Sequence, residues 1–289
     1  MGCLNCFKAK GEKGPAQIST SQTQPTWSLP TIDTPTCLRT YKDGCCWRSF
    51  TLKSVKIFQP KGEEVIRKIL PIWSKKFCVK YGLAVQLFEA AALRYVAENS
   101  SIPVPKVYCA FQNERITYIL MDFVEGEEIG KNRANRREEE KQSLLEQLEG
   151  IYEELHNIPH PYPGVPAAAD MQALYDPRFF GRGIWYFGPF ANEAEFNNFL
   201  RCGMQVDSPW LDSGDSLVTN EEKAEMRELI AFHDLNPHKI CFTQGDASSS
   251  NIMVKDGKVV ALIDFELSGF YPEYWEYTTA MNVNRNDGF

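Results

Sequence analysis

Residues 244–266 constrain the fold of this chain more than any other stretch, because a polar loop there leads into two short apolar segments. Asp256 and Gly257 lie between these segments. An Asp-Gly pair flanked by apolar runs is the strongest short-range signal for a β-hairpin. A two-residue turn at this point would place Lys255 opposite Lys258, so the stretch predicts two antiparallel strands.

The open end of this hairpin gathers polar side chains. The expected register places Asn251 opposite Leu262, two residues before Asp264. Amide and carboxylate oxygens are ligands that Mg²⁺ prefers, so we expect Asn251 and Asp264 to bind one metal ion. Asp246 lies on the loop that enters the hairpin, where it can accept a proton. One base and two metal ligands are the components of a kinase catalytic loop. The alternative is a solvated surface turn with an Asx cap.

Length and charge exclude several classes of protein. The chain has 289 residues and is 43% hydrophobic, which suits one large domain or two lobes with an ample core. Its 31 basic and 38 acidic residues give a net charge of −7, so we expect no nucleic-acid partner. No apolar run reaches 18 residues, and this predicts that no segment spans a membrane.

The N-terminal sequence and the cysteines predict a cytoplasmic protein. The first residues lack the apolar core of a signal peptide, so we expect a reducing compartment and no disulfides. Cys6 stands where N-myristoylation requires Ser or Thr, and we therefore expect no lipid anchor. Of the nine cysteines, three lie in apolar, strand-like runs and are expected to be buried: Cys78, Cys109 and Cys241.

The first half of the chain predicts a flexible leader over residues 1–45, followed by short strands and a helix. Residues 50–58 and 76–81 have strand-like patterns, and residues 84–99 form an alanine-rich helix. No Gly-x-Gly-x-x-Gly occurs, so any loop that holds nucleotide phosphates must use other residues. Lys80 is either a solvated strand end or the partner of Glu89 in an ion pair that positions phosphates.

The second half predicts a mainly helical region. Strands at residues 106–111 and 116–123 come first, and the chain turns at residues 124–126, where a connection between lobes is expected. Helices follow at residues 138–156, 194–201 and 220–233, and a buried strand at 240–243 leads to the polar loop. Residues 176–190 form an aromatic loop that either covers a pocket or packs against the helical region.

Five stretches in this order resemble the aminoglycoside phosphotransferase-like kinases, and most of all their large fungal group. The first is Phe-Cys-Val-Lys-Tyr-Gly at residues 77–82, and the others are residues 89–108, 118–126, 188–196 and 242–276. The resemblance extends over roughly residues 77–284. It implies an α+β, two-lobed, protein-kinase-like fold with a small antiparallel N-lobe and a larger, mainly helical C-lobe.

The resemblance also implies boundaries and roles. The N-lobe, with the nucleotide-binding elements and the hinge, would span residues 46–126, and the C-lobe residues 127–289, without the family's terminal helix. Asp246 would be the catalytic base, and Asn251 and Asp264 would bind Mg²⁺. Lys80 would contact the phosphates of ATP, and Glu89 would orient Lys80. The hinge residues Asp122 and Val124 would bind the adenine through their backbone groups.

The chain departs from the family pattern at the catalytic loop. Gln244 replaces the usual histidine before Gly245 and Asp246, and this exchange predicts a less rigid loop. Phe265 replaces the usual tryptophan after the metal-binding aspartate, which is a milder change.

Two functions follow from this sequence. The first is an ATP-dependent phosphotransferase that acts on a hydroxyl of a small molecule. The alternative, motivated by Gln244, is a degenerate kinase fold that binds a nucleotide or a partner without turnover. A protein kinase is disfavoured because no glycine follows Asp264-Phe265-Glu266 and no Ala-Pro-Glu segment occurs.

Overall fold

The structure is a computed structural model that describes residues 45–58, 65–182, 185–212 and 219–283. The predicted leader lies outside the described residues except for Cys45, and so do Cys3 and Cys6. Within the described part, no helix is long and apolar enough to cross a membrane. The three cysteines expected to be buried are buried, as predicted.

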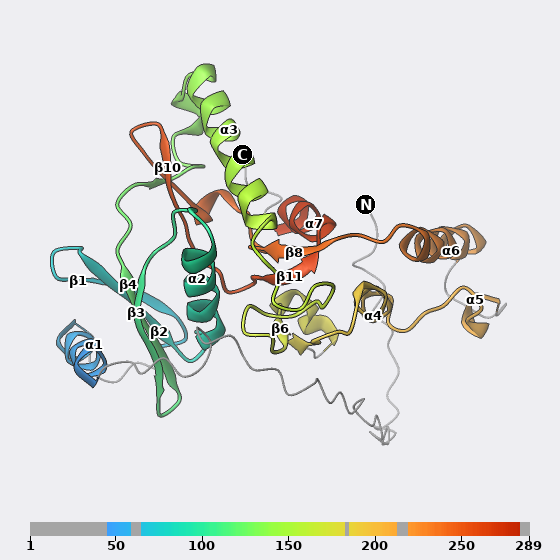
Figure 1. Cartoon of the computed structure of the whole chain (residues 1–289), viewed down its shortest axis with the longest axis horizontal. Coiled ribbons are helices and arrows are strands. Elements are labelled where there is room, and N and C mark those ends of the chain that lie inside the picture. The colour runs from blue at the N-terminus through green and yellow to red at the C-terminus, as the bar shows by residue number, and fades with distance from the viewer. Residues whose placement is uncertain (1–44, 59–64, 183–184, 213–218, 284–289) are drawn as a thin grey trace, which may run out of the picture. The chain divides into compact units, whose positions relative to one another are not determined.

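A four-stranded antiparallel sheet in the order β1-β2-β4-β3 contains Lys80 on its second strand (Figure 1). Its strands are β1 (Lys68–Ile72), β2 (Phe77–Gly82), β3 (Val107–Asn113) and β4 (Ile116–Asp122). Strands β2, β3 and β4 confirm the prediction, whereas β1 was not predicted.

Each face of this sheet is covered by one helix. Successive side chains of a strand point to opposite faces. Accordingly, Val79 and Leu120 pack in the cluster that contains Val55 of helix α1 (Cys45–Phe58). Cys78 and Ile119 face the other way and pack with Leu93. Both faces of β2 are therefore shielded from solvent, and all six of its residues are buried.

The strand predicted for residues 50–58 is wrong, because this segment belongs to α1. Its β-branched residues favour a strand locally. In the helix, however, Thr51 and Val55 are one turn apart and both are buried against the sheet. Thr51 also donates a hydrogen bond to the carbonyl oxygen of Trp47. Packing of one helical face therefore overrides the local preference.

Helix α2 (Leu87–Asn99) is the predicted alanine-rich helix, but it begins three residues later than expected. The amides of Leu83 and Ala84 donate to the carbonyl oxygens of Val65 and Ile66, so this part of the chain stays extended. The helix then packs against β3 and β4.

The remainder of the chain is mainly helical. The short strand β5 (Glu127–Glu128) pairs with β9 (Ile252–Lys255), and β8 (Ile240–Thr243) pairs with β11 (Gly269–Pro272). Strands β6 (Leu174–Tyr175) and β7 (Tyr186–Phe187) form a small hairpin. The α-helices are α3 (Glu138–His156), α4 (Glu193–Leu200), α5 (Pro209–Asp212), α6 (Asn220–Leu235) and α7 (Tyr274–Val283). Short 3₁₀ turns lie at Arg133–Asn135, Pro177–Arg182 and Ser249–Asn251.

One apolar cluster joins the sheet to the helical region. Leu144, Leu148 and Leu155 lie on the buried face of α3, as the sequence periodicity predicted, and pack in one cluster with Phe242 of β8 and with α2. Strand β8 therefore packs against α3 and α2, and the loop with Gln244 and Asp246 follows directly after it.

The predicted hairpin is present as β9 (Ile252–Lys255) and β10 (Lys258–Leu262), and its turn pairs Lys255 with Lys258. The expected pairing of Asn251 with Leu262 is wrong. A β-bulge between Val259 and Ala261 adds one residue, so Leu262 pairs with Ile252 instead. The carbonyl oxygen of Asn251 consequently accepts a hydrogen bond from the amide of Ile263.

The described part of the aromatic loop at residues 176–190 packs against the helical region and also lines a cavity. Phe187 stacks on Phe199 of α4 and Phe179 contacts the same ring edge to face, so part of the loop packs against the helical region. Asp176 and Phe179 also line a cavity.

Candidate active site

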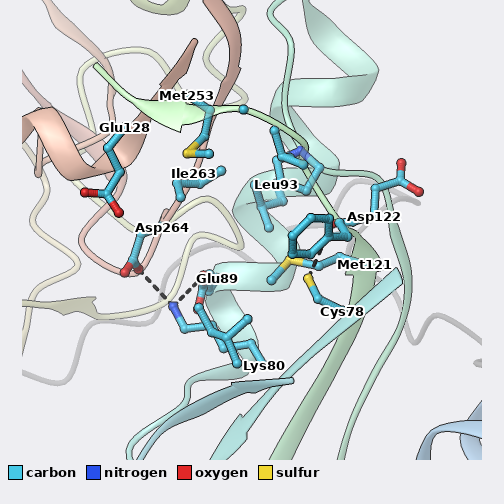
Figure 2. A pocket seen from close by; sticks show the side chains of 15 residues that line it. Cys78, Lys80, Glu89, Leu93, Met121, Asp122, Glu128, Met253, Ile263 and Asp264 are labelled. Carbon is cyan, nitrogen blue, oxygen red and sulfur yellow. Dashed lines mark hydrogen bonds and ion pairs between the residues drawn. The ribbon is translucent and has the colours of Figure 1, made fainter. Parts of the chain in front are cut away.

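Lys80 is the central charge of the site. Its Nζ lies 2.8 Å from Glu89 Oε1 and 2.9 Å from Asp264 Oδ1 (Figure 2). The three residues come from β2, α2 and the segment after β10. The structure therefore brings together three of the predicted site residues, and two side chains of this triad, those of Lys80 and Glu89, are at most 2% exposed.

The charges of this triad depend on one another. Burial alone would lower the pKa of Lys80, but the carboxylates of Glu89 and Asp264 raise it above its usual value. Lys80 is therefore held in the charged form. Burial raises the pKa of Glu89, and the ammonium of Lys80 opposes this shift. Glu89 Oε2 is buried and accepts no hydrogen bond from the described residues.

Asp264 adopts a backbone conformation that is rare for a residue with a side chain. Its φ is +58°, in the left-handed region. Such strain persists where the surroundings impose it, and it is common at functional sites. Here the turn directs the carboxylate of Asp264, which is 31% exposed, toward Lys80 and the adjoining cleft.

A cleft of about 260 Å³ lies beside this triad. Apolar side chains from the sheet, α2 and β9 form much of its wall, among them Ile69, Leu93, Met121 and Met253. Lys80, Glu89 and Asp264 lie at its polar end. The cleft can thus hold a flat apolar ring at one side and an anionic group at the other.

The two predicted hinge residues, Asp122 and Val124, differ in whether their backbone groups are available to bind a ligand. Asp122 directs its carboxylate away from the cleft (Figure 2), where it accepts a hydrogen bond from Tyr108. Its amide donates to Lys106, and its carbonyl oxygen accepts from Cys78 Sγ. Among the described residues, no hydrogen bond engages the amide or carbonyl of Val124, so both groups can meet a ligand.

Asp246 lies on the loop after β8 and is partly buried. Burial raises its pKa above the usual value, while hydrogen bonds from Ser248 and Asn251 lower it in part. Its Oδ1 is buried and accepts no hydrogen bond within the described residues. A carboxylate with one free, desolvated oxygen is suited to accept a proton.

Asn251 links Asp246 to the segment that carries Asp264. Its Nδ2 donates to the carbonyl oxygen of Asp246 at 3.0 Å, and its own carbonyl accepts from Ile263, the residue before Asp264. Oxygen donors from an amide and a carboxylate fit a small, hard cation such as Mg²⁺. The carboxylates of Glu89, Asp264 and Glu266 also place oxygens within 4.8 Å of one another.

Gln244, the main departure from the family pattern, is fully buried and its side chain is paired at both ends. Nε2 donates to the carbonyl oxygen of Ile263 at 2.8 Å, and Oε1 accepts from the hydroxyl of Tyr152 at 3.0 Å. The loop is therefore anchored to α3 and to the segment that carries Asp264. Tyr152 was missed from the sequence because nothing there relates it to a residue 92 positions away.

Two further residues fix the backbone of this loop. Glu276, at the start of α7, accepts hydrogen bonds from the amides of Gln244 and Gly245 at 2.7 and 3.1 Å. Burial raises the pKa of Glu276 to about 7, although these two amides lower it in part. Arg178 donates to the carbonyl oxygen of Gly245 and is itself held by both carboxylate oxygens of Asp176. Nothing in the sequence pattern indicated this contact of Arg178.

A second cavity, of about 230 Å³, lies next to this anchored loop. Its lining residues are Asp176, Arg178, Phe179, Trp275, Thr278 and Thr279. Arg178 both lines this cavity and contacts the residue before Asp246, so the cavity adjoins the backbone of the loop.

Comparisons with known proteins agree with this geometry. The profile of the Phosphotransferase enzyme family matches residues 82–288. A thermostable mutant of aminoglycoside phosphotransferase APH(4)-Ia, solved with ADP and hygromycin B, gives a TM-score of 0.52 at 15% identity, covering 76% of this chain and 69% of that one. Aminoglycoside phosphotransferase APH(4)-Ia itself gives 0.51 at 16% identity, covering 80% and 74%. No curated protein sequence gives a significant match.

Proposed function

Because the chain belongs to the phosphotransferase enzyme family and has its two-lobed, kinase-like α+β fold, we propose that it transfers the γ-phosphoryl group of ATP to a hydroxyl of a small molecule. The observation that carries this proposal is the contact of Lys80 with both Glu89 and Asp264 at the polar end of the cleft. In kinases, a lysine paired with a helix glutamate positions nucleotide phosphates.

The cleft supports binding of the nucleotide. Its apolar wall accepts the adenine ring, and the free amide and carbonyl of Val124 can hydrogen-bond the edge of the base. Asp122 would act indirectly, by holding the strand end through Tyr108 and Cys78. Lys80 then lies where it neutralises charge on the phosphates, and Glu89 fixes its position.

Asp246 is proposed to be the base. It accepts the proton of the acceptor hydroxyl as that oxygen bonds to the γ-phosphorus and the bond to the β-γ bridging oxygen breaks, releasing ADP. Asn251 and Asp264 would hold Mg²⁺, which supplies charge neutralisation on the phosphates. The raised pKa of Asp246 favours proton uptake during the reaction.

The acceptor is proposed to bind in the second cavity. Arg178 connects the cavity wall to Gly245, and the positive charge of Arg178 lowers the pKa of Asp246 in part, which indicates that the two side chains are close. Thr278 is exposed at this cavity. Thr278→Trp should raise the KM for the acceptor and leave hydrolysis of ATP by water unchanged.

The contacts of Gln244 support turnover over ligand binding without turnover. The sequence-based doubt was that Gln244 leaves the loop less rigid than histidine would. Gln244 is paired at both ends of its side chain, and Glu276 and Arg178 hold the loop backbone. The loop thus has four anchors that do not require a histidine.

The decisive experiment measures ADP formation with a library of amino alcohols, sugars and aminoglycosides, in parallel with ATP affinity. Asp246→Asn should lower kcat by about 10² to 10⁴ and leave the Kd for ATP within a few-fold. Equal turnover by both proteins would overturn the role of Asp246. Binding of Mg²⁺ and ATP by the wild type without turnover on any acceptor would favour the degenerate kinase fold.

A further inference from the structure

Arg67 lies at the edge of the site, just before β1, and has no role in the function described so far. Its Nη2 lies 2.6 Å from Glu266 Oε1 and 2.5 Å from Glu266 Oε2. Oxygens of Glu266, Asp264 and Glu89 lie within 4.8 Å of one another, so the guanidinium is next to the carboxylates around Lys80. Its side chain is 41% exposed and therefore accessible to a ligand.

The backbone places Arg67 firmly. The amides of Leu83 and Ala84 donate to the carbonyl oxygens of Val65 and Ile66, which holds the two residues before Arg67 against the segment that follows β2. Gly82 permits this close approach. It has a φ of +148°, and a Cβ there would lie 2.2 Å from the carbonyl oxygen of Ile66 and 2.9 Å from the Cα of Arg67. Only glycine fits at this point.

The ion pair with Glu266 orients the side chain. Arg67 itself lies in a bend directly before β1, two residues from Ile69. Ile69 lines the cleft and pairs directly with Lys80 in the sheet. Arg67 contacts Glu266 and Lys80 contacts Asp264, so the two cations meet the same cluster of carboxylates at the polar end of the cleft.

The carboxylates of the site outnumber its cationic side chains. The three carboxylates of Glu89, Asp264 and Glu266 face one ammonium and one guanidinium, which leaves one negative charge in excess. Lys80 is already shared by two carboxylates. Even with the proposed Mg²⁺, a polyphosphate that enters this site is bound more favourably when the guanidinium of Arg67 meets it than when Lys80 alone does.

This inference rests on the proposed function. We propose that Arg67 binds the phosphates of the nucleotide and replaces the glycine-rich clamp that this sequence lacks. The contacts with Glu266 use only Nη2, so among the described residues Nη1 and Nε are free to donate to phosphate oxygens. Arginine presents several donors in a planar fork, which suits phosphate groups. Glu266 holds the guanidinium in position for them.

Direct nucleotide binding tests the proposal. Titration calorimetry of the full chain with Mg²⁺ present gives the Kd for ATP, ADP and adenosine. Arg67→Gln should raise the Kd for ATP about 10- to 100-fold, as expected for loss of a charge-assisted hydrogen bond, and leave the Kd for adenosine within about threefold. Arg67→Lys should recover part of the loss. Arg115→Gln, on the exposed β3–β4 turn, is the matched control and should behave as the wild type.

A purely structural role for Arg67 predicts a different pattern. If Arg67 served only to hold Glu266, Glu266→Gln would reproduce the loss of ATP affinity, whereas our proposal expects Glu266→Gln to bind ATP at least as tightly as the wild type. Unchanged ATP affinity in Arg67→Gln, with normal thermal unfolding, would overturn the inference alone. A wild-type protein that binds no ATP would overturn the proposed function and this inference with it.

Discussion

The side chain of Gln244 donates a hydrogen bond from Nε2 to the carbonyl oxygen of Ile263, 2.8 Å away. Gln244 lies two residues before the proposed base, and Ile263 directly precedes Asp264 of the proposed metal site. This contact therefore couples the two loops that must act together. Tyr152 completes the arrangement by donating to Oε1 of the same side chain.

Gln244→Leu should lower both stability and kcat. It leaves the carbonyl of Ile263 and the hydroxyl of Tyr152 buried without partners, which costs about 2 kcal/mol or more in the free energy of unfolding. Urea unfolding and steady-state kinetics measure the two effects. Tyr152→Phe removes only one contact and should cost less. Gln244→His should give no gain in kcat, and a clear gain would show that loop support limits the wild type.

Lys80→Met should destabilise the protein more than the double variant Lys80→Met with Glu89→Leu. Loss of Lys80 alone leaves Glu89, which is 1% exposed, as an unpaired carboxyl group in the core. Removing one partner of a buried pair costs about 3 to 5 kcal/mol, whereas replacing both by apolar residues is close to neutral. The midpoints of urea unfolding compare the variants. Equal midpoints for the single and double variants would contradict this account of the pair.

Gly245→Ala should be more harmful than Gly257→Ala. Both glycines have positive φ, +78° and +71°, so both substitutions carry a similar backbone penalty of about 1 kcal/mol. A Cβ at Gly245 would in addition lie 2.4 Å from the carbonyl oxygen of Leu267, whereas Gly257 has open space. Thermal unfolding should show the larger loss for Gly245→Ala, together with a lower kcat that Gly257→Ala does not share.

The stability of the wild type relative to Glu276→Gln should fall as the pH rises from 5 to 8. Burial raises the pKa of Glu276 from its usual 4.5 to about 7, so protonation favours the folded state. This contribution is fully present below pH 4.5 and is lost as the pH rises through 7. Glutamine does not titrate, which makes the variant the reference. A difference in unfolding free energy that stays constant over this range would refute the shift.

Local sequence predicted much of the architecture. The alanine-rich segment, the leucine spacing of α3 and the Asp-Gly turn each depend on residues within a few positions of one another, so their pattern was sufficient. Predictions failed where contacts between residues far apart in the sequence determine the local structure. The segment of α1 has strand-forming residues, yet it becomes a helix because Thr51 and Val55 cover a face of the sheet.

The sequence by itself determined where we expect the site, at Asp246, Asn251 and Asp264, since their order and spacing are local. Only the tertiary structure decided how they meet. The bulge in β10 changed the residue that pairs with the end of β9, so Asn251 does not pair with Leu262. Tyr152 contacts Gln244 from 92 residues away, and Arg67 contacts Glu266 from 199 residues away. Periodicity reports which face of an element is buried, but it does not report which distant side chain fills the space opposite. That choice follows from packing of the whole chain.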